Sequence, residues 1–129
     1  MGLVIGRSTD NRTSVSFEEE VTKKIHNAID QCSAETGVER EVLKIARDGN
    51  YMSGDKYEKL IHCCYVKSGY AYENGRIKVK EATMLFPKEY ATQVEKVIRD
   101  CDKELNDPVK NTYQAFVCFQ ENSPVRMGL

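Results

Sequence analysis

The sequence has no excess of charge of one sign. Its 129 residues include 19 Lys and Arg against 20 Asp and Glu, which gives a formal net charge of -1. A phosphate backbone or an anionic lipid surface needs clustered positive charge to bind tightly. The even mixture therefore argues against nucleic acid and membrane surfaces as partners, and the chain length predicts one domain.

Long apolar runs are also absent. The longest runs, such as residues 116–119, are far shorter than the ~20 residues that a transmembrane helix needs. The apolar stretch in residues 1–6 is too short for the central region of a signal peptide. We therefore expect a soluble, mature chain.

Residue patterns of catalytic and metal sites are missing as well. Neither His26, on the polar side of its helix, nor His62 has a nucleophile at a recognisable spacing. A possible calcium loop that starts at residue 48 has Met52 and Lys59 where oxygen ligands belong. Residues 62–64 (His-Cys-Cys) splay by about 100 degrees each on a helix and cannot converge on one ion. We expect no enzyme activity, no cofactor and no metal.

Apolar residues recur at helical spacing along most of the chain, and no strand pattern or internal repeat is evident. Ser16 can cap the first helix, Gly37 ends it, and Pro87 can begin the fifth. The predicted helices cover residues 16–36, 39–48, 55–68, 79–86, 87–105 and 112–120. The sequence thus predicts an all-α single domain of about six short amphipathic helices.

The two ends of the chain lack this periodicity. Residues 1–16 form a polar leader that we predict to be flexible, residues 17–120 the helical domain, and residues 121–129 a polar tail. Asn11 begins an Asn-Arg-Thr sequon in the leader. A glycan on Asn11 and an ordinary unmodified leader are the two alternatives.

The cysteines are few but unevenly spaced, at positions 32, 63, 64, 101 and 118. Five in this length is below the density of a disulfide-rich miniprotein. The adjacent pair Cys63 and Cys64 cannot bridge to itself without large backbone strain, so one thiol is left over. The pattern favours a secreted helical shell that is held by disulfides.

Several sequence blocks around these cysteines can be compared with known families. The blocks are residues 32–38 (Cys-Ser-Ala-Glu-Thr-Gly-Val), residues 59–63 followed by Gly69 and residues 73–77, Phe86-Pro87 leading to residues 97–101, and residues 107–109 followed by Cys118. Together they resemble the arthropod odorant-binding proteins of the pheromone-binding and general odorant-binding class. The resemblance spans about residues 17–120.

The chain departs from that family at two positions. The usual pattern has six cysteines, but Lys59 and Val109 stand at its second and fifth, which normally bond to each other. The sequence therefore resembles the four-cysteine "minus-C" branch, which implies bridges from Cys32 to Cys63 and from Cys101 to Cys118. Cys64 is then the free thiol, either as a small buried hydrophobe or as a partner in an intermolecular bridge. We expect the junction near Lys59 and Val109 to be mobile.

The resemblance implies a function without chemistry. It implies a secreted, extracellular protein that binds and transports small hydrophobic ligands in a cavity between the helices, as a monomer or weak homodimer, with a chemosensory receptor as a candidate partner. One alternative is a secreted helical structural or interaction protein of the same fold without a cavity. A plant-type lipid-transfer module is another, but that family needs eight cysteines.

Candidate cavity residues come from the inner helix faces and from the resemblance, and ordinary core packing is the alternative for each. They are Ile25, Ile29, Ile61, Tyr65, Val66, Met84, Leu85, Val94, Val97, Ile98, Tyr113, Phe116 and Phe119. Tyr65 and Tyr113 are the best candidates for a polar contact with a ligand, because a buried phenol seeks a hydrogen-bond partner. The sequence leaves open whether the tail closes the cavity.

Overall fold

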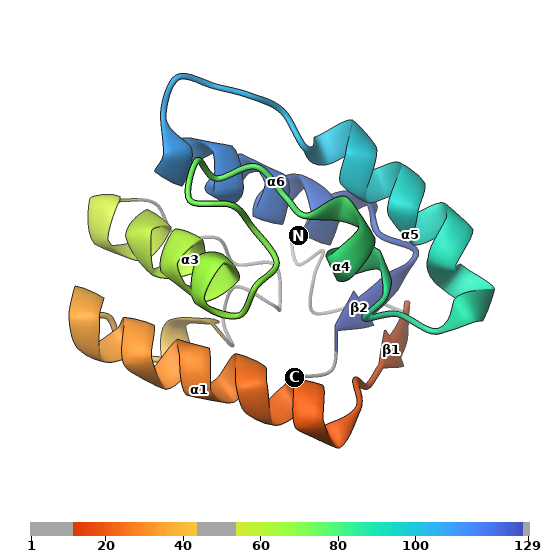
Figure 1. Cartoon of the computed structure of the whole chain (residues 1–129), viewed down its shortest axis with the longest axis horizontal. Helices are drawn as coiled ribbons and strands as arrows, with labels where there is room; N and C mark the ends of the chain where they lie inside the picture. The colour runs from red at the N-terminus through yellow and green to blue at the C-terminus, as the bar shows by residue number, and fades with distance from the viewer. Residues whose placement is uncertain (1–11, 44–53, 128–129) are drawn as a thin grey trace, which may run out of the picture.

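The computed structural model describes residues 12–43 and 54–127 (Figure 1). Within these ranges the chain forms β1 (Thr13–Val15), α1 (Glu19–Thr36), α3 (Asp55–Lys67), α4 (Val79–Thr83), α5 (Lys88–Cys101), α6 (Pro108–Asn122) and β2 (Val125–Met127). Of the predicted second helix, residues 41–43 are helical, residues 39 and 40 are not, and residues 44–48 lie outside the described ranges. The all-α, single-domain prediction is confirmed.

Some helix ends follow the sequence signals and others follow tertiary contacts. Gly37 ends α1 with a positive φ of 76°, and its N–H donates to the Ser33 carbonyl. The prediction that Ser16 caps this helix is wrong: the cap position is Glu18, because residues 13–15 are held extended in a strand. Asp107 caps α6, and its carboxylate accepts from the backbone N–H of Val109, so this helix begins earlier than predicted.

The helix α5 ends at Cys101, not at residue 105 as predicted. Asp102 follows, and its Oδ1 accepts from the backbone N–H of Ile77 at 3.0 Å and from Nε of Arg76 at 3.0 Å. These contacts come from a distant loop and draw the chain out of the helix. The predicted fourth helix is also shorter in the structure and ends at Thr83.

The expectation of no strands is wrong, because β1 and β2 form a parallel pair with Thr13 opposite Val125 and Val15 opposite Met127. The apolar side chains of Val15 and Val125 are buried in the main core. Arg12, which precedes β1, links it to the end of α6: its Nη1 donates to the carbonyls of Gln120 at 2.8 Å and Ser123 at 2.9 Å. These strands lie in the ranges that we assigned to the leader and the tail. Each has three residues, too few to give a clear alternating pattern.

The two implied disulfides are confirmed. Cys32 in α1 bonds to Cys63 in α3 with a Cα–Cα distance of 5.8 Å, and Cys101 in α5 bonds to Cys118 in α6 with 5.7 Å. Cys64 is the free cysteine. Figure 1 shows the resulting layout: α1 and α3 lie side by side, α3 faces α6, and α4 and α5 cover the other end. No described helix is long and apolar enough to cross a membrane.

A loop over residues 70–78 joins α3 to α4 and is clamped against the start of α6. Thr112 Oγ1 donates to the Gly75 carbonyl at 3.0 Å, and Asn111 Nδ2 donates to the Asn74 carbonyl at 2.8 Å. Gly75 takes a positive φ of 87° and approaches Pro108 closely. The clamp holds the middle of the loop against α6, and Tyr70 and Ile77 on either side of it are buried.

An ion pair joins α3 to α6 next to Lys59 and Val109. Lys110 Nζ donates to Glu58 Oε1 at 2.5 Å, and the Glu58 side chain is only 6% exposed. A buried carboxylate that loses its cation is strongly unfavourable. The pair therefore holds the two helices where the six-cysteine pattern has a covalent bond.

Removing this cation is expected to loosen the junction. In a Lys110→Met variant, the first turns of α3 and α6 should exchange their amide protons at least severalfold faster, because Glu58 would be left buried without its partner. Hydrogen exchange with mass spectrometry measures this. Lys96→Met is the control, since the Lys96–Asp100 pair is exposed on one helix and should matter little. Equal exchange in both variants would contradict the assignment.

Candidate functional site

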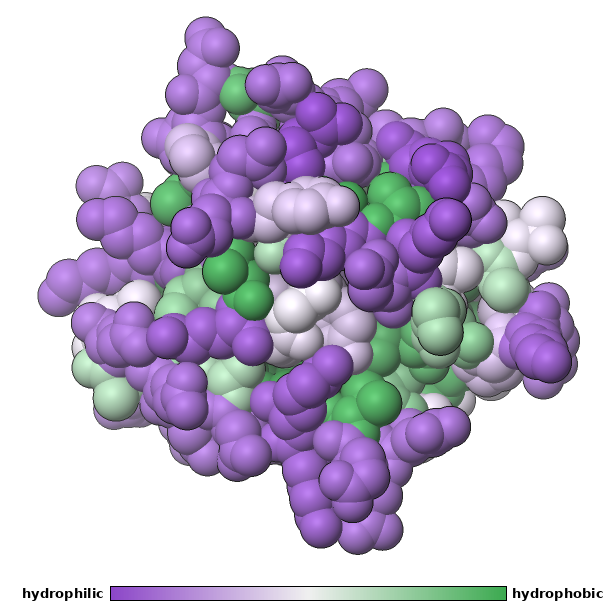
Figure 2. Space-filling model, in the orientation of Figure 1, coloured by the Kyte–Doolittle hydropathy of each residue, from purple (hydrophilic) through white to green (hydrophobic). Residues whose placement is uncertain are grey.

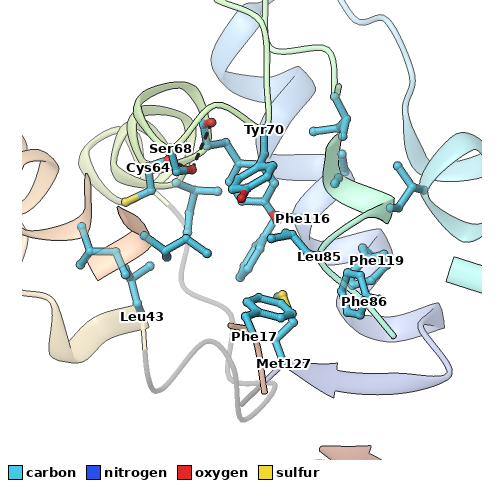
Figure 3. A pocket seen from close by; sticks show the side chains of 18 of the residues that line it. Phe17, Leu43, Cys64, Ser68, Tyr70, Leu85, Phe86, Phe116, Phe119 and Met127 are labelled. Carbon is cyan, nitrogen blue, oxygen red and sulfur yellow. Dashed lines mark hydrogen bonds between the residues drawn. The ribbon is translucent and has the colours of Figure 1, made fainter. Parts of the chain in front are cut away.

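The helices enclose a cavity of about 190 Å³. Its wall draws side chains from every labelled helix, from the connecting segments and from β2 (Figure 3). The lining residues are Phe17, Ile25, His26, Ile29, Arg40, Leu43, Ile61, Cys64, Tyr65, Ser68, Tyr70, Ile77, Ala82, Leu85, Phe86, Ile98, Cys101, Ala115, Phe116, Phe119 and Met127. Most of these side chains are apolar, as in typical small-molecule sites.

Many of the predicted cavity residues meet at this wall. Those that line it are Ile25, Ile29, Ile61, Tyr65, Leu85, Ile98, Phe116 and Phe119. They lie on α1, α3, α5 and α6 and just after α4, so the inner stripe of each helix points to a common space. Their contact with a ligand stays a prediction.

Five predicted residues, Val66, Met84, Val94, Val97 and Tyr113, do not line the cavity. Met84 follows α4 at its C-terminal cap and is 81% exposed. Val94 is fully buried in the main core, against which Val66 and Val97 also pack. Tyr113 packs edge-on against Tyr57, with ring centroids 5.8 Å apart. Helical spacing identifies an inner face but does not separate core packing from cavity wall.

Sequence analysis missed an aromatic group at the end of the cavity beside the strands. Phe17 and Phe86 meet edge to face with ring centroids 5.4 Å apart, and Phe86 lies 5.7 Å from Phe119. Figure 3 shows Met127 next to Phe17 in this region. In the structure Phe17 precedes α1 and Phe86 lies between α4 and α5. Their spacing from Val21 and from Ala82 is helical and was the available signal for both. Met127 had no clear signal, because β2 is too short to show an alternating pattern.

The cavity also has a polar edge. Arg40 Nη2 donates to His26 Nδ1 at 2.7 Å, and Arg40 Nη1 pairs with Asp30. An arginine can only donate, so His26 carries its proton on Nε2 when it is neutral. His26, which the sequence places on the polar side of its helix, is half-buried and lines the cavity. On the side of the molecule that faces the viewer in Figure 2, apolar side chains reach the surface near the centre, among hydrophilic ones.

Two ionisable groups of α3 are neutral in this wall. Burial raises the pKa of the Cys64 thiol to about 12. Burial also raises the pKa of Tyr65, with a smaller contribution from the charges of Cys64 and Tyr57. An apolar wall of neutral groups can hold an uncharged molecule but provides no activated nucleophile. In the described ranges, no cluster of His, Cys, Asp and Glu converges on a metal position.

Comparisons with known proteins agree with this architecture. The PBP/GOBP family matches residues 14–122. Odorant-binding protein 7 of Anopheles gambiae, solved with four disulfide bridges and in complex with an azo compound, is 23% identical, with a TM-score of 0.66 over 81% of this chain and 86% of that chain. A medfly odorant-binding protein is 16% identical, with a TM-score of 0.61 over 78% of this chain and 88% of that chain. No curated protein sequence gives a significant match.

Proposed function

Because the chain belongs to the PBP/GOBP family, we propose that it binds a small hydrophobic molecule non-covalently and carries it in an extracellular fluid. The observation that carries the proposal is the largely apolar cavity of about 190 Å³ between the disulfide-linked helices. A cavity of roughly 150 Å³ already accommodates benzene. The ligand we propose is therefore compact and at least of that size. The azo compound in the mosquito protein supports the same class of ligand.

Transport outside the cell is supported by the disulfides. Two of them join four of the five cysteines, and such bonds persist in oxidising compartments. The fifth, Cys64, lies in the cavity wall. We therefore propose that the carrier does not dimerise through Cys64. The cavity favours the carrier over a structural protein of the same fold, whose interior would be filled.

Binding of a fluorescent apolar probe tests the proposal. The emission of an aminoanthracene probe should rise and saturate on titration with the protein, and small volatile molecules should displace it. An Ala115→Leu variant, which extends a cavity-lining side chain, should weaken probe binding about fivefold or more because it fills space that the ligand needs.

The matched control is Ala91→Leu on α5, since Ala91 does not line the cavity. That variant should bind the probe as the original chain does. Probe emission that stays unchanged over a wide protein concentration range would exclude the carrier function. Equal weakening in both alanine variants would exclude this cavity as the binding site.

A further inference from the structure

The Tyr65 hydroxyl has no hydrogen-bond partner in the described part of the chain. Tyr65 lies near the end of α3, and its ring meets Phe116 edge to face at 6.3 Å. It is enclosed deeply enough that burial raises its pKa, yet part of its surface remains accessible. Since Tyr65 lines the cavity, that accessible surface faces the cavity. A buried hydroxyl normally finds a hydrogen-bond partner.

A second phenol is positioned beside the first. The Tyr70 backbone N–H donates to the Tyr65 carbonyl at 2.9 Å, which turns the chain and brings both rings to the same wall. Lys24 Nζ lies 4.5 Å from the Tyr70 ring centroid and holds the ring by a cation–π contact. Tyr70 is 8% exposed, and its hydroxyl also has no partner among the described residues. Figure 3 shows this ring directed into the cavity, toward Leu85 and Phe116.

Two other polar groups of the wall, Ser68 and Arg40, are already engaged. The Ser68 hydroxyl donates to the carbonyl of Cys64 at 2.6 Å. Arg40 is occupied by Asp30 and His26, so its positive charge is compensated. Asp30 would also repel a carboxylate that approached Arg40. The free capacity of the cavity is therefore that of neutral donors, namely the two phenol O–H groups and the Nε2–H of His26, which suits an uncharged acceptor oxygen.

We propose that the Tyr65 and Tyr70 hydroxyls form a hydrogen-bonding site that selects apolar ligands carrying one neutral acceptor oxygen, such as a ketone, aldehyde or ester. This inference rests on the proposed function and specifies its ligand class. The apolar wall binds the hydrocarbon part of the ligand by burial. The phenols set the preference among ligands of equal size, because only an oxygenated ligand satisfies them.

A pair of matched ligands tests the site. A nine-carbon methyl ketone and the alkene in which a methylene group replaces its carbonyl oxygen have nearly the same shape. Each is used to displace the aminoanthracene probe, and the ratio of their dissociation constants is measured. Relative to the original chain, a Tyr65→Phe plus Tyr70→Phe variant should shift this ratio toward the alkene by about three- to tenfold. The single variants apportion the shift between the two phenols.

The control is Tyr72→Phe, because Tyr72 is 53% exposed and outside the cavity. It should leave the ratio unchanged, and thermal unfolding should show that all variants fold. An unchanged ratio in the double variant, with the probe still bound, would overturn this inference and leave the carrier function standing. Failure of the original chain to bind the probe would overturn both.

Discussion

Replacement of Gly75 by alanine is expected to lower the free energy of unfolding by about 3–4 kcal/mol. An added Cβ would lie 1.9 Å from the Pro108 carbonyl oxygen and 2.9 Å from the Asn111 Cβ. The backbone φ of 87° adds strain that glycine does not have. The loop can relieve the clash only by leaving the start of α6, which breaks the hydrogen bonds from Asn111 and Thr112. Urea denaturation measures the loss.

Gly37→Ala is the matched control for this prediction. Gly37 has a similar φ of 76°, but no atom lies within 4 Å of the position of an added Cβ. Its replacement should therefore cost only about 1 kcal/mol, the usual penalty for a left-handed helix cap. Equal losses in the two variants would show that strain alone acts at Gly75. The Gly75 variant should also bind ligands more weakly, since the clamped loop carries Tyr70 and Ile77 to the cavity.

Alkylation of Cys64 is expected to be slower in the folded protein by roughly a thousandfold at pH 8. The reactive form is the thiolate, and burial raises the thiol pKa from 9.0 to about 12. Iodoacetamide labelling followed by mass spectrometry compares the native chain with the chain unfolded in denaturant, disulfides intact. A bound ligand should slow the native reaction further, because Cys64 lines the cavity. A native rate close to the unfolded rate would refute the burial argument.

The same shift predicts a loss of stability at high pH. The unfolded thiol ionises near 9.0 and the folded thiol near 12, so between these values the unfolded chain binds fewer protons. The contribution of Cys64 to stability is therefore complete below about pH 9 and is lost as the pH rises toward 12. A Cys64→Ala variant should lose less stability than the original chain over this interval. Identical pH curves for both would assign the loss to other groups.

The sequence predicted the helical framework well because local signals specify it. Gly37 ends α1 where expected, and the bridges implied by the family resemblance join Cys32 to Cys63 and Cys101 to Cys118. The end of α5 was predicted too late because it depends on Asp102, whose partners Arg76 and Ile77 lie in another loop. Periodicity contains no information about such a contact.

The cavity was predicted less completely for a related reason. Val94 and Ile98 lie one turn apart on the same face of α5, yet Val94 is in the core and Ile98 lines the cavity. Which of them meets empty space depends on the side chains that other helices bring opposite. Met127 reaches the wall only because β2 pairs with a strand from the other end of the sequence. Which residues line the cavity therefore depends on how the elements pack together, and the pattern within one helix does not determine it.

The parallel pairing of β1 with β2 also determines how the molecule bears mechanical load. The chain enters the pair at Thr13 and leaves it after Met127, at opposite ends of the strands. A force that pulls these two points apart therefore acts along the strands and loads all their hydrogen bonds together, in shear. An antiparallel pair with the same ends would open one bond at a time. The paired strands should therefore resist separation of the two ends of the domain, and the Arg12 hydrogen bonds to Gln120 and Ser123 add to that resistance.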